Sequence, residues 1–165
     1  MDKLDLVRKL MLKVYSADTS FNPSGWSKEN PTYGHCAVVS LVLNDWLDAK
    51  IAKVKVNGES HYFNIIDGNI IDLTGEQFGH EVDYSNMEMS TREYLLSNEN
   101  TKERYELLKK RFEFEFYESC YNCDKCGTRH LWEEINWITS SYGACEDCYS
   151  QLSEEEKAQI EIDFE

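Results

Sequence analysis

Residues 34–46 read Gly34-His35-Cys36-Ala37-Val38-Val39-Ser40-Leu41-Val42-Leu43-Asn44-Asp45-Trp46. The turn-forming segment Asn30-Pro31-Thr32-Tyr33-Gly34 precedes this apolar run, and no helix breaker follows until Asp48. A helix is therefore expected to begin at or just before Cys36. Because the free N–H groups and positive dipole end of a helix start favour a thiolate, Cys36 is a candidate nucleophile. The alternative is a small buried hydrophobe, as most unpaired cysteines are.

Three antiparallel strands are expected after this helix. They lie at residues 51–56, 60–66 and 69–74, and the turn signals Asn57-Gly58 and Asp67-Gly68 separate them. One core helix beside such a meander indicates an α+β fold.

The register of the second hairpin decides whether His61 and Asp72 meet. A two-residue loop pairs Ile66 with Asn69 and places His61 and Asp72 on one face as diagonal neighbours. A three-residue loop would place them on opposite faces. The structural alternatives are a half-buried strand histidine and an edge carboxylate. Taken with Cys36, the order of thiol, imidazole and carboxylate predicts an activated-cysteine site.

Several segments resemble the small bacterial YunG-like family. They are Gly34-His35-Cys36, Ser60-His61-Tyr62-Phe63-Asn64, Asp67-Gly68, Ile71-Asp72-Leu73-Thr74-Gly75-Glu76-Gln77-Phe78 and Ser90-Thr91-Arg92-Glu93-Tyr94-Leu95-Leu96, followed by Thr101, Arg104-Tyr105 and Leu107-Leu108. The resemblance covers residues 1–111 and implies a papain-like or transglutaminase-like core, with the cysteine helix packed on a small antiparallel sheet. His35 departs from the family pattern, where glutamine usually precedes the cysteine, and Phe63 replaces a tryptophan. The family supplies no substrate.

Residue chemistry predicts attack on an amide or ester carbonyl. Cys36 attacks as a thiolate, His61 carries its proton to the leaving group, and Asp72 accepts the other imidazole N–H. The enzyme would be a peptidase, a deamidase or an acyl transferase, and a Cys-His-Asp triad does not choose among these.

The oxyanion of such a reaction needs hydrogen-bond donors, and the backbone N–H of Cys36 is one. Asn30 lies six residues before Cys36, where papain-like enzymes carry their oxyanion glutamine. Trp26 and His35 are competing donors, and a turn role before Pro31 is the alternative for Asn30.

Five of the six cysteines lie between Cys120 and Cys148. Two Cys-x-x-Cys pairs, Cys123 with Cys126 and Cys145 with Cys148, have eighteen residues between them, which is typical of a four-cysteine Zn²⁺ site. Gly127 completes a zinc-knuckle pattern after the first pair. These features predict a structural zinc in a C-terminal zinc ribbon or treble clef. Disulfides are the alternative to a metal. A register shift would bring in Cys120, which lies three residues before Cys123, and His130 could replace one thiolate, although an ordinary surface histidine is the favoured interpretation of His130.

The chain is expected to form two domains, a papain-like core at residues 1–118 and a zinc-binding module at 119–165. Net charge is −14, and residues 119–165 hold three Lys and Arg against eleven Asp and Glu. This acidity makes nucleic acid an improbable partner, so a protein or peptide substrate or partner is expected.

No signal-peptide pattern and no apolar run of membrane-spanning length occurs in the sequence, so a cytoplasmic protein is expected. A second function class remains open, a non-enzymatic acidic protein-binding module on the same fold. The sequence does not indicate an oligomeric state.

Overall fold

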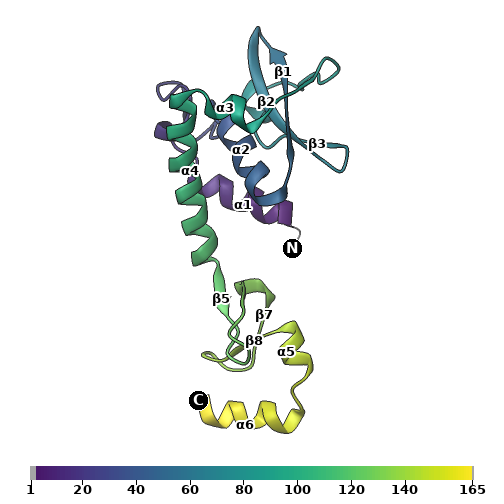
Figure 1. The fold of residues 1–165 in the computed structure, drawn as a ribbon. Helices are drawn as coiled ribbons and strands as arrows, with labels where there is room; N and C mark the ends of the chain where they lie inside the picture. The colour runs from purple at the N-terminus through teal and green to yellow at the C-terminus, as the bar shows by residue number, and fades with distance from the viewer. Residues whose placement is uncertain (1–2, 165) are drawn as a thin grey trace. The chain divides into compact units, whose positions relative to one another are not determined.

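Helix α2, Cys36–Leu47, begins at the cysteine, as the sequence predicts (Figure 1). Its central residues are buried: Val38, Val39, Ser40, Leu41, Val42 and Leu43. The helix ends where Asp48 adopts the left-handed conformation, with φ 52°. Helix α1, Lys3–Val14, buries the stripe of Val7, Leu10, Met11 and Val14, whose spacing of three and four residues is that of one helix face.

The sheet of this region has four antiparallel strands in the order β3-β2-β1-β4. They are β1 Lys50–Val56, β2 Glu59–Ile66, β3 Asn69–Ile71 and β4 Glu88–Met89. Both hairpins have two-residue turns, because Val56 pairs with Glu59 and Ile66 pairs with Asn69. Of the two loops that the sequence left open for the second hairpin, the structure has the two-residue one.

Two expectations about the strands are wrong. The third strand ends at Ile71 rather than Thr74, because the Asp72 carboxylate binds the Thr74 N–H and turns the chain. Strand β4 was not expected, since two residues are too few to show an alternating pattern.

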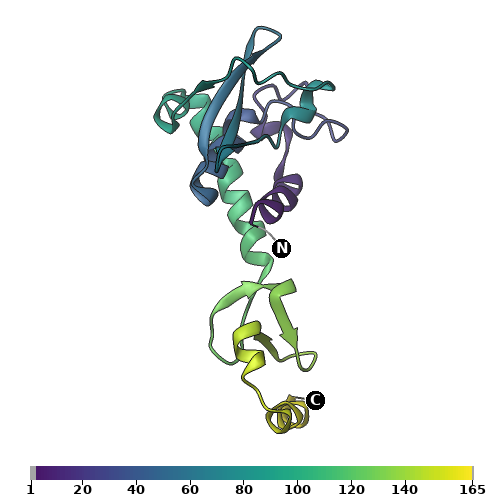
Figure 2. The same ribbon diagram turned by 90° about the vertical axis from the view of Figure 1, so that its right-hand side faces the viewer.

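The two faces of the sheet are covered differently (Figures 1 and 2). Because successive strand residues alternate between faces, Asn64 and Phe63 point in opposite directions. Asn64 lies on the face covered by α2 and donates its amide to the Ser40 carbonyl at 3.1 Å. Phe63 packs on the other side with Val82 and Tyr84, from the segment that follows β3. His61 shares the face of Phe63.

Short helices and one long helix complete the first part of the chain. They are the 3-10 helices Ala17–Thr19 and Gly75–Phe78, α3 Arg92–Leu96 and α4 Glu99–Glu118. The alternating residues 112–116 belong to α4, in which Phe112 is fully buried while Phe114 is exposed.

The C-terminal region consists of two hairpins and two helices. These elements are β5 Cys120–Asn122, β6 Arg129–Leu131, the 3-10 helix Trp132–Glu134, β7 Ile135–Trp137, β8 Gly143–Cys145, α5 Glu146–Ser150 and α6 Glu154–Phe164. Strand β5 pairs with β6, and β7 pairs with β8.

The computed structural model describes residues 3–164, which divide into two compact units with their boundary between Glu115 and Phe116. Met1, Asp2 and Glu165, at the ends of the two expected domains, lie outside the described residues. None of the helices within residues 3–164 is long and apolar enough to cross a membrane.

Candidate functional site

Cys36 is held at the first position of α2 by a closely packed loop. Gly34 has φ +74°, and a Cβ there would lie 2.4 Å from the Ser20 hydroxyl, so only glycine fits. The Phe21 N–H donates to the Gly34 carbonyl at 2.8 Å. Cys36 is half-buried, and the first N–H groups of a helix have no acceptor within it. The thiol therefore lies beside free backbone donors.

His61 and Asp72 form the hydrogen bond that the two-residue turn predicts. Nε2 of His61 donates to Oδ2 of Asp72 at 2.5 Å, and both side chains are almost completely buried. The other ring nitrogen, Nδ1, is buried without an aligned partner in the described residues. Asp72 thus fixes the orientation of the ring and leaves Nδ1 for a different group.

Cys36 lies close enough to His61 to affect its protonation. Burial alone lowers the pKa of His61, but the hydrogen bond to Asp72 and the interaction with the Cys36 thiol outweigh burial and raise the pKa to about 9. The structure therefore brings the thiol, imidazole and carboxylate together in the expected order along the chain.

Asp72 is kept ionised by further donors. Its Oδ1 accepts the Thr74 N–H at 2.8 Å, and its Oδ2 accepts the Tyr84 hydroxyl at 2.8 Å. Burial acts to raise the pKa of Asp72, but the hydrogen bonds from His61, Thr74 and Tyr84 hold that pKa below its ordinary value. A buried carboxylate with several donors is a stable anion beside an imidazolium.

The three candidate oxyanion side chains all make structural hydrogen bonds. The Trp26 indole donates to the Pro31 carbonyl at 3.0 Å, and the Asn30 amide donates to the Gln77 carbonyl at 3.0 Å. His35 is fully buried and pairs through Nε2 with the Thr19 hydroxyl at 2.9 Å. Burial lowers the pKa of His35 to about 4, so its ring is neutral.

Gln77 is a site residue that the sequence reasoning did not single out. Its side-chain oxygen accepts the Gly34 N–H at 3.1 Å, and its amide donates to the Thr74 carbonyl at 2.8 Å. It therefore ties the segment after Asp72 to the loop before Cys36. Its place in the quoted family motif was the only available signal.

Arg104, from α4, is a second such residue. It is 7% exposed, and its Nε donates to the side chain of Asn100 at 2.9 Å. Its guanidinium donates to the Thr19 and Gly34 carbonyls at 3.2 and 3.4 Å. Burial lowers the pKa of Arg104, while the nearby Cys36 acts in the opposite direction. Arg104 is a buried cation close to the thiol.

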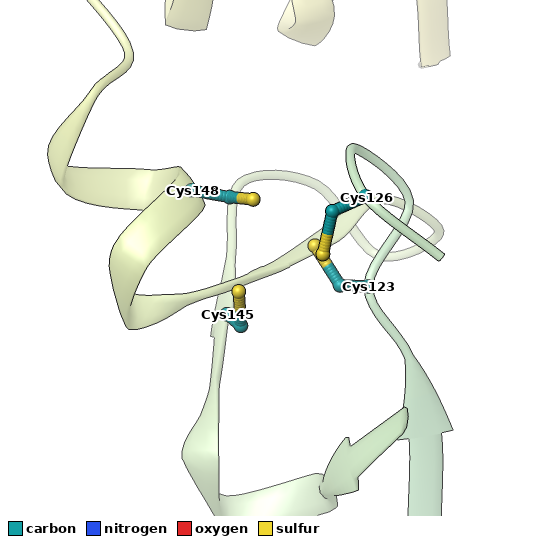
Figure 3. Close-up of side chains that lie close together, drawn as sticks. All are labelled: Cys123, Cys126, Cys145 and Cys148. Carbon is teal, nitrogen blue, oxygen red and sulfur yellow. The ribbon is translucent and has the colours of Figure 1, made fainter. Parts of the chain in front are cut away.

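A separate cluster in the C-terminal unit, here called the four-cysteine cluster, consists of Cys123, Cys126, Cys145 and Cys148. The four sulfur atoms lie within 4.8 Å of one another and converge on one point (Figure 3). Sulfurs around a tetrahedral zinc with Zn–S bonds of about 2.3 Å lie about 3.8 Å apart. The residues present therefore fit a metal ion held by four thiolates.

The first cysteine pair has the backbone geometry of a knuckle. Gly127 has φ +75° and donates its N–H to the Cys123 carbonyl at 2.8 Å. Burial acts to raise the pKa of Cys123, but backbone N–H groups of Cys145, Cys126 and Lys125 lower that pKa to about 6. Donors directed at sulfur favour the thiolate that a metal needs.

The second pair comes from the last residue of β8, Cys145, and from α5, which carries Cys148. Cys120 and His130 are not in the cluster: Cys120 donates its thiol to the Phe116 carbonyl, and His130 belongs to β6. The predicted set of four clustered cysteines is confirmed.

Comparison with known proteins identifies the first unit. Residues 3–117 match the family described as YunG protein. The chain is also 30% identical over 109 residues to "Uncharacterized protein YunG" of Bacillus subtilis (strain 168), a match that covers 66% of this chain and 90% of the relative. No solved structure matches the chain. The family match ends before the first cysteine of the four-cysteine cluster.

Proposed function

The chain belongs to the YunG family, and we propose that it is a cysteine-dependent enzyme acting on an amide, with a structural zinc module. The observation that carries the proposal is the bond from His61 Nε2 to Asp72, which leaves Nδ1 without a partner among the described residues, on a ring whose pKa the nearby Cys36 helps to raise. We also propose that the first unit is a papain-like or transglutaminase-like core, because a cysteine helix packs on an antiparallel sheet that carries the histidine.

The proposed reaction uses each group in one role. The Cys36 thiolate attacks the amide carbonyl, and the C–S bond forms as the C–N bond breaks. The His61 imidazolium gives its proton to the departing nitrogen, and Asp72 stabilises the charged ring. Water completes hydrolysis or deamidation, whereas an amine completes acyl transfer.

The Cys36 backbone N–H is the proposed oxyanion donor. Asn30, Trp26 and His35 are weaker candidates than the sequence alone suggested, because each already makes a hydrogen bond within the protein. Arg104 is better placed to stabilise the thiolate electrostatically than to bind the oxyanion, because its guanidinium donates to two carbonyls.

The four-cysteine cluster is proposed to hold one Zn²⁺ that supplies folding energy and no chemistry, because four thiolates close a tetrahedral site. Of the two zinc folds expected, the treble clef is favoured, since Cys148 comes from a helix that follows a hairpin. We propose the boundary between core and module at residues 118 and 119. Reduced thiols and thiolate-bound zinc suit the cytoplasm, which we propose as the location.

The proposal is tested by alkylation and acylation of the zinc-loaded protein. Cys120 is a matched internal control, because it is also half-buried and lies outside the cluster. Cys36 should react with iodoacetamide at least about tenfold faster than Cys120 near neutral pH. A nitrophenyl ester should release a burst of one nitrophenolate per chain, absent in Cys36→Ala. Equal labelling of the two thiols and no burst would eliminate the enzyme proposal.

The second candidate function is an acidic protein-binding module without catalysis. The observation that favours it is the net charge of −8 on residues 119–165. This alternative needs no reactive thiol, so the same labelling experiment separates the two.

A further inference from the structure

Three aromatic side chains of the C-terminal unit form one surface cluster, here called the aromatic face: Tyr121, Trp132 and Trp137. The ring centroid of Tyr121 lies 5.0 Å from that of Trp132 and 4.7 Å from that of Trp137. The two indoles stack at 5.0 Å with an interplanar angle of 21°. Trp132 is 47% exposed and Trp137 is 39% exposed, so large apolar rings remain in contact with solvent.

The aromatic face is held rigidly by the cysteine knuckle. The Tyr121 hydroxyl donates to the carboxylate of Asp124, which lies between Cys123 and Cys126 and also accepts the Gly143 N–H at 2.7 Å. A Cβ at residue 143 would lie 3.1 Å from the Trp137 ring and 2.4 Å from Ile135, so glycine lets the indole pack on the hairpin. Exposed rings fixed in place lose little conformational entropy when a partner binds.

The charges around the aromatic face favour a cationic partner. Residues 119–165 contain eleven carboxylates and three cations. Two of these cations already lie over other rings: Arg129 over Tyr117 at 4.9 Å, and Lys157 over Tyr149 at 4.3 Å. Within residues 3–164, no Lys or Arg is placed over the aromatic face. The largest ring cluster of an acidic module thus has no internal cation.

We propose that the aromatic face binds an arginine- or lysine-rich segment of a protein partner. A guanidinium stacks on an indole face, and its charge is complementary to the carboxylates that follow Trp132, at residues 133 and 134. Tryptophans are also the residues that most often dominate binding energy at protein interfaces. The proposal is independent of the thiol chemistry.

Nucleic acid is the competing partner for exposed rings, because bases also stack on tryptophan. The acidic charge of the module repels phosphates, and no excess of cations is available to neutralise them. The basic segment is therefore favoured.

The test uses zinc-loaded full-length Cys36→Ala protein, so that binding is measured without turnover. A peptide of alternating arginine and glycine is titrated by calorimetry against a glutamate–glycine peptide of equal length and a single-stranded oligonucleotide. Of these three ligands, only the arginine–glycine peptide should bind. Trp132→Ala and Trp137→Ala should each weaken binding by about tenfold. Phe114→Ala, which removes an exposed ring from α4, should leave affinity unchanged.

A second measurement does not depend on the variants folding. In protein that keeps all four tryptophans, the NMR resonances of the Trp132 and Trp137 indole N–H groups should shift during the titration. The resonances of Trp26 and Trp46 should not shift. Absence of peptide binding, equal affinity of the tryptophan variants, stationary indole signals or preference for the oligonucleotide would each overturn the proposal.

Discussion

At the scale of single residues, the thiol site depends on the hydrogen bonds that His61 and Asp72 make. The Asp72 carboxylate accepts a hydrogen bond from Nε2 of His61, and it also accepts hydrogen bonds from Thr74 and Tyr84. The result is a carboxylate that stays ionised and an imidazole that stays oriented. The sequence left the pair dependent on the turn, and the two-residue turn is the one that places both residues on one face. It did not predict Tyr84, which lies outside any regular element.

Removing the carboxylate charge should lower the reactivity of Cys36. Asp72→Asn keeps the side-chain size but destabilises the imidazolium, and His61→Ala removes the base; each should slow iodoacetamide labelling of Cys36 by about tenfold or more. Because the two residues act through one thiol, the double variant should be little slower than His61→Ala alone. Labelling rates read by mass spectrometry decide this. Additive losses would show that the two residues act separately.

The stability of the first unit should fall as pH rises through the window set by His61. Its pKa is about 9 in the folded protein against an ordinary 6.5, so the folded state binds more protons between these values. The stabilisation is complete below 6.5 and lost above about 9, on the order of 3 kcal/mol for a buried pair.

Urea unfolding measures this effect when Trp132 and Trp137 are phenylalanine, so that Trp26 and Trp46 report the first unit alone. The free energy of unfolding is compared between protein that keeps His61 and its His61→Gln variant. The difference between the two should shrink as pH rises. A constant difference across the window would contradict the assignment.

At the scale of elements, the contact between α2 and the sheet positions the thiol next to the histidine. Asn64 makes this contact specific: it is 1% exposed and donates to the carbonyls of Ser40 in α2 and Lys50 in β1. A buried amide that bonds two elements fixes their relative placement.

Replacing Asn64 with alanine should destabilise the first unit by about 2 kcal/mol, because the Ser40 carbonyl loses its buried donor and a small cavity remains. Asn69→Ala is the control, since Asn69 is the exposed first residue of β3 and its side chain makes only a weak bond at 3.4 Å. Denaturant midpoints measure both. A loss at position 69 as large as that at position 64 would show that the bridge is unimportant.

The elements that the sequence predicted well have strong local signals. Helix α2 was predicted from a breaker followed by an apolar run, and the β1–β2 hairpin from Asn57-Gly58, which takes φ of 53° and 86°. The two-residue strand β4 and the loop contacts of Gln77 were not predictable, because each depends on a tertiary hydrogen bond. The end of β3 at Ile71 depends instead on the local bond from the Thr74 N–H to the Asp72 carboxylate. For Arg104 the family resemblance was the available signal, since a buried cation in a charged helix otherwise looks like any surface arginine.

At the scale of the whole molecule, the two candidate sites lie in different units. The family match covers residues 3–117, whereas all four clustered cysteines belong to the unit Phe116–Glu165. The cluster was predictable because ligand spacing is a short-range property. The core of the first unit has its own buried side chains and needs no metal, so the two units should respond separately to chelation.

Purified protein should contain one zinc per chain. Cys148→Ser should lose the metal, because a tetrahedral site loses its fourth thiolate, while Cys120→Ser should retain it. Removing zinc should leave Cys36 labelling unchanged within about twofold, since the first unit folds around its own core. Metal content and labelling rates are measured on the same samples. Retention of zinc in Cys148→Ser would show that the ligand set is wrong, and loss of Cys36 reactivity on chelation would show that the units are coupled.

The stacked pair of Trp132 and Trp137 has a spectroscopic consequence. Two indoles in contact couple their electronic transitions, and such exciton coupling gives paired bands of opposite sign in far-ultraviolet circular dichroism. Because Asp124 of the knuckle holds Tyr121 against both indoles, these bands should collapse when the four thiolates lose their ion. The stacked pair would then report optically on metal binding by the four-cysteine cluster, in solution and without a dye or an isotope label.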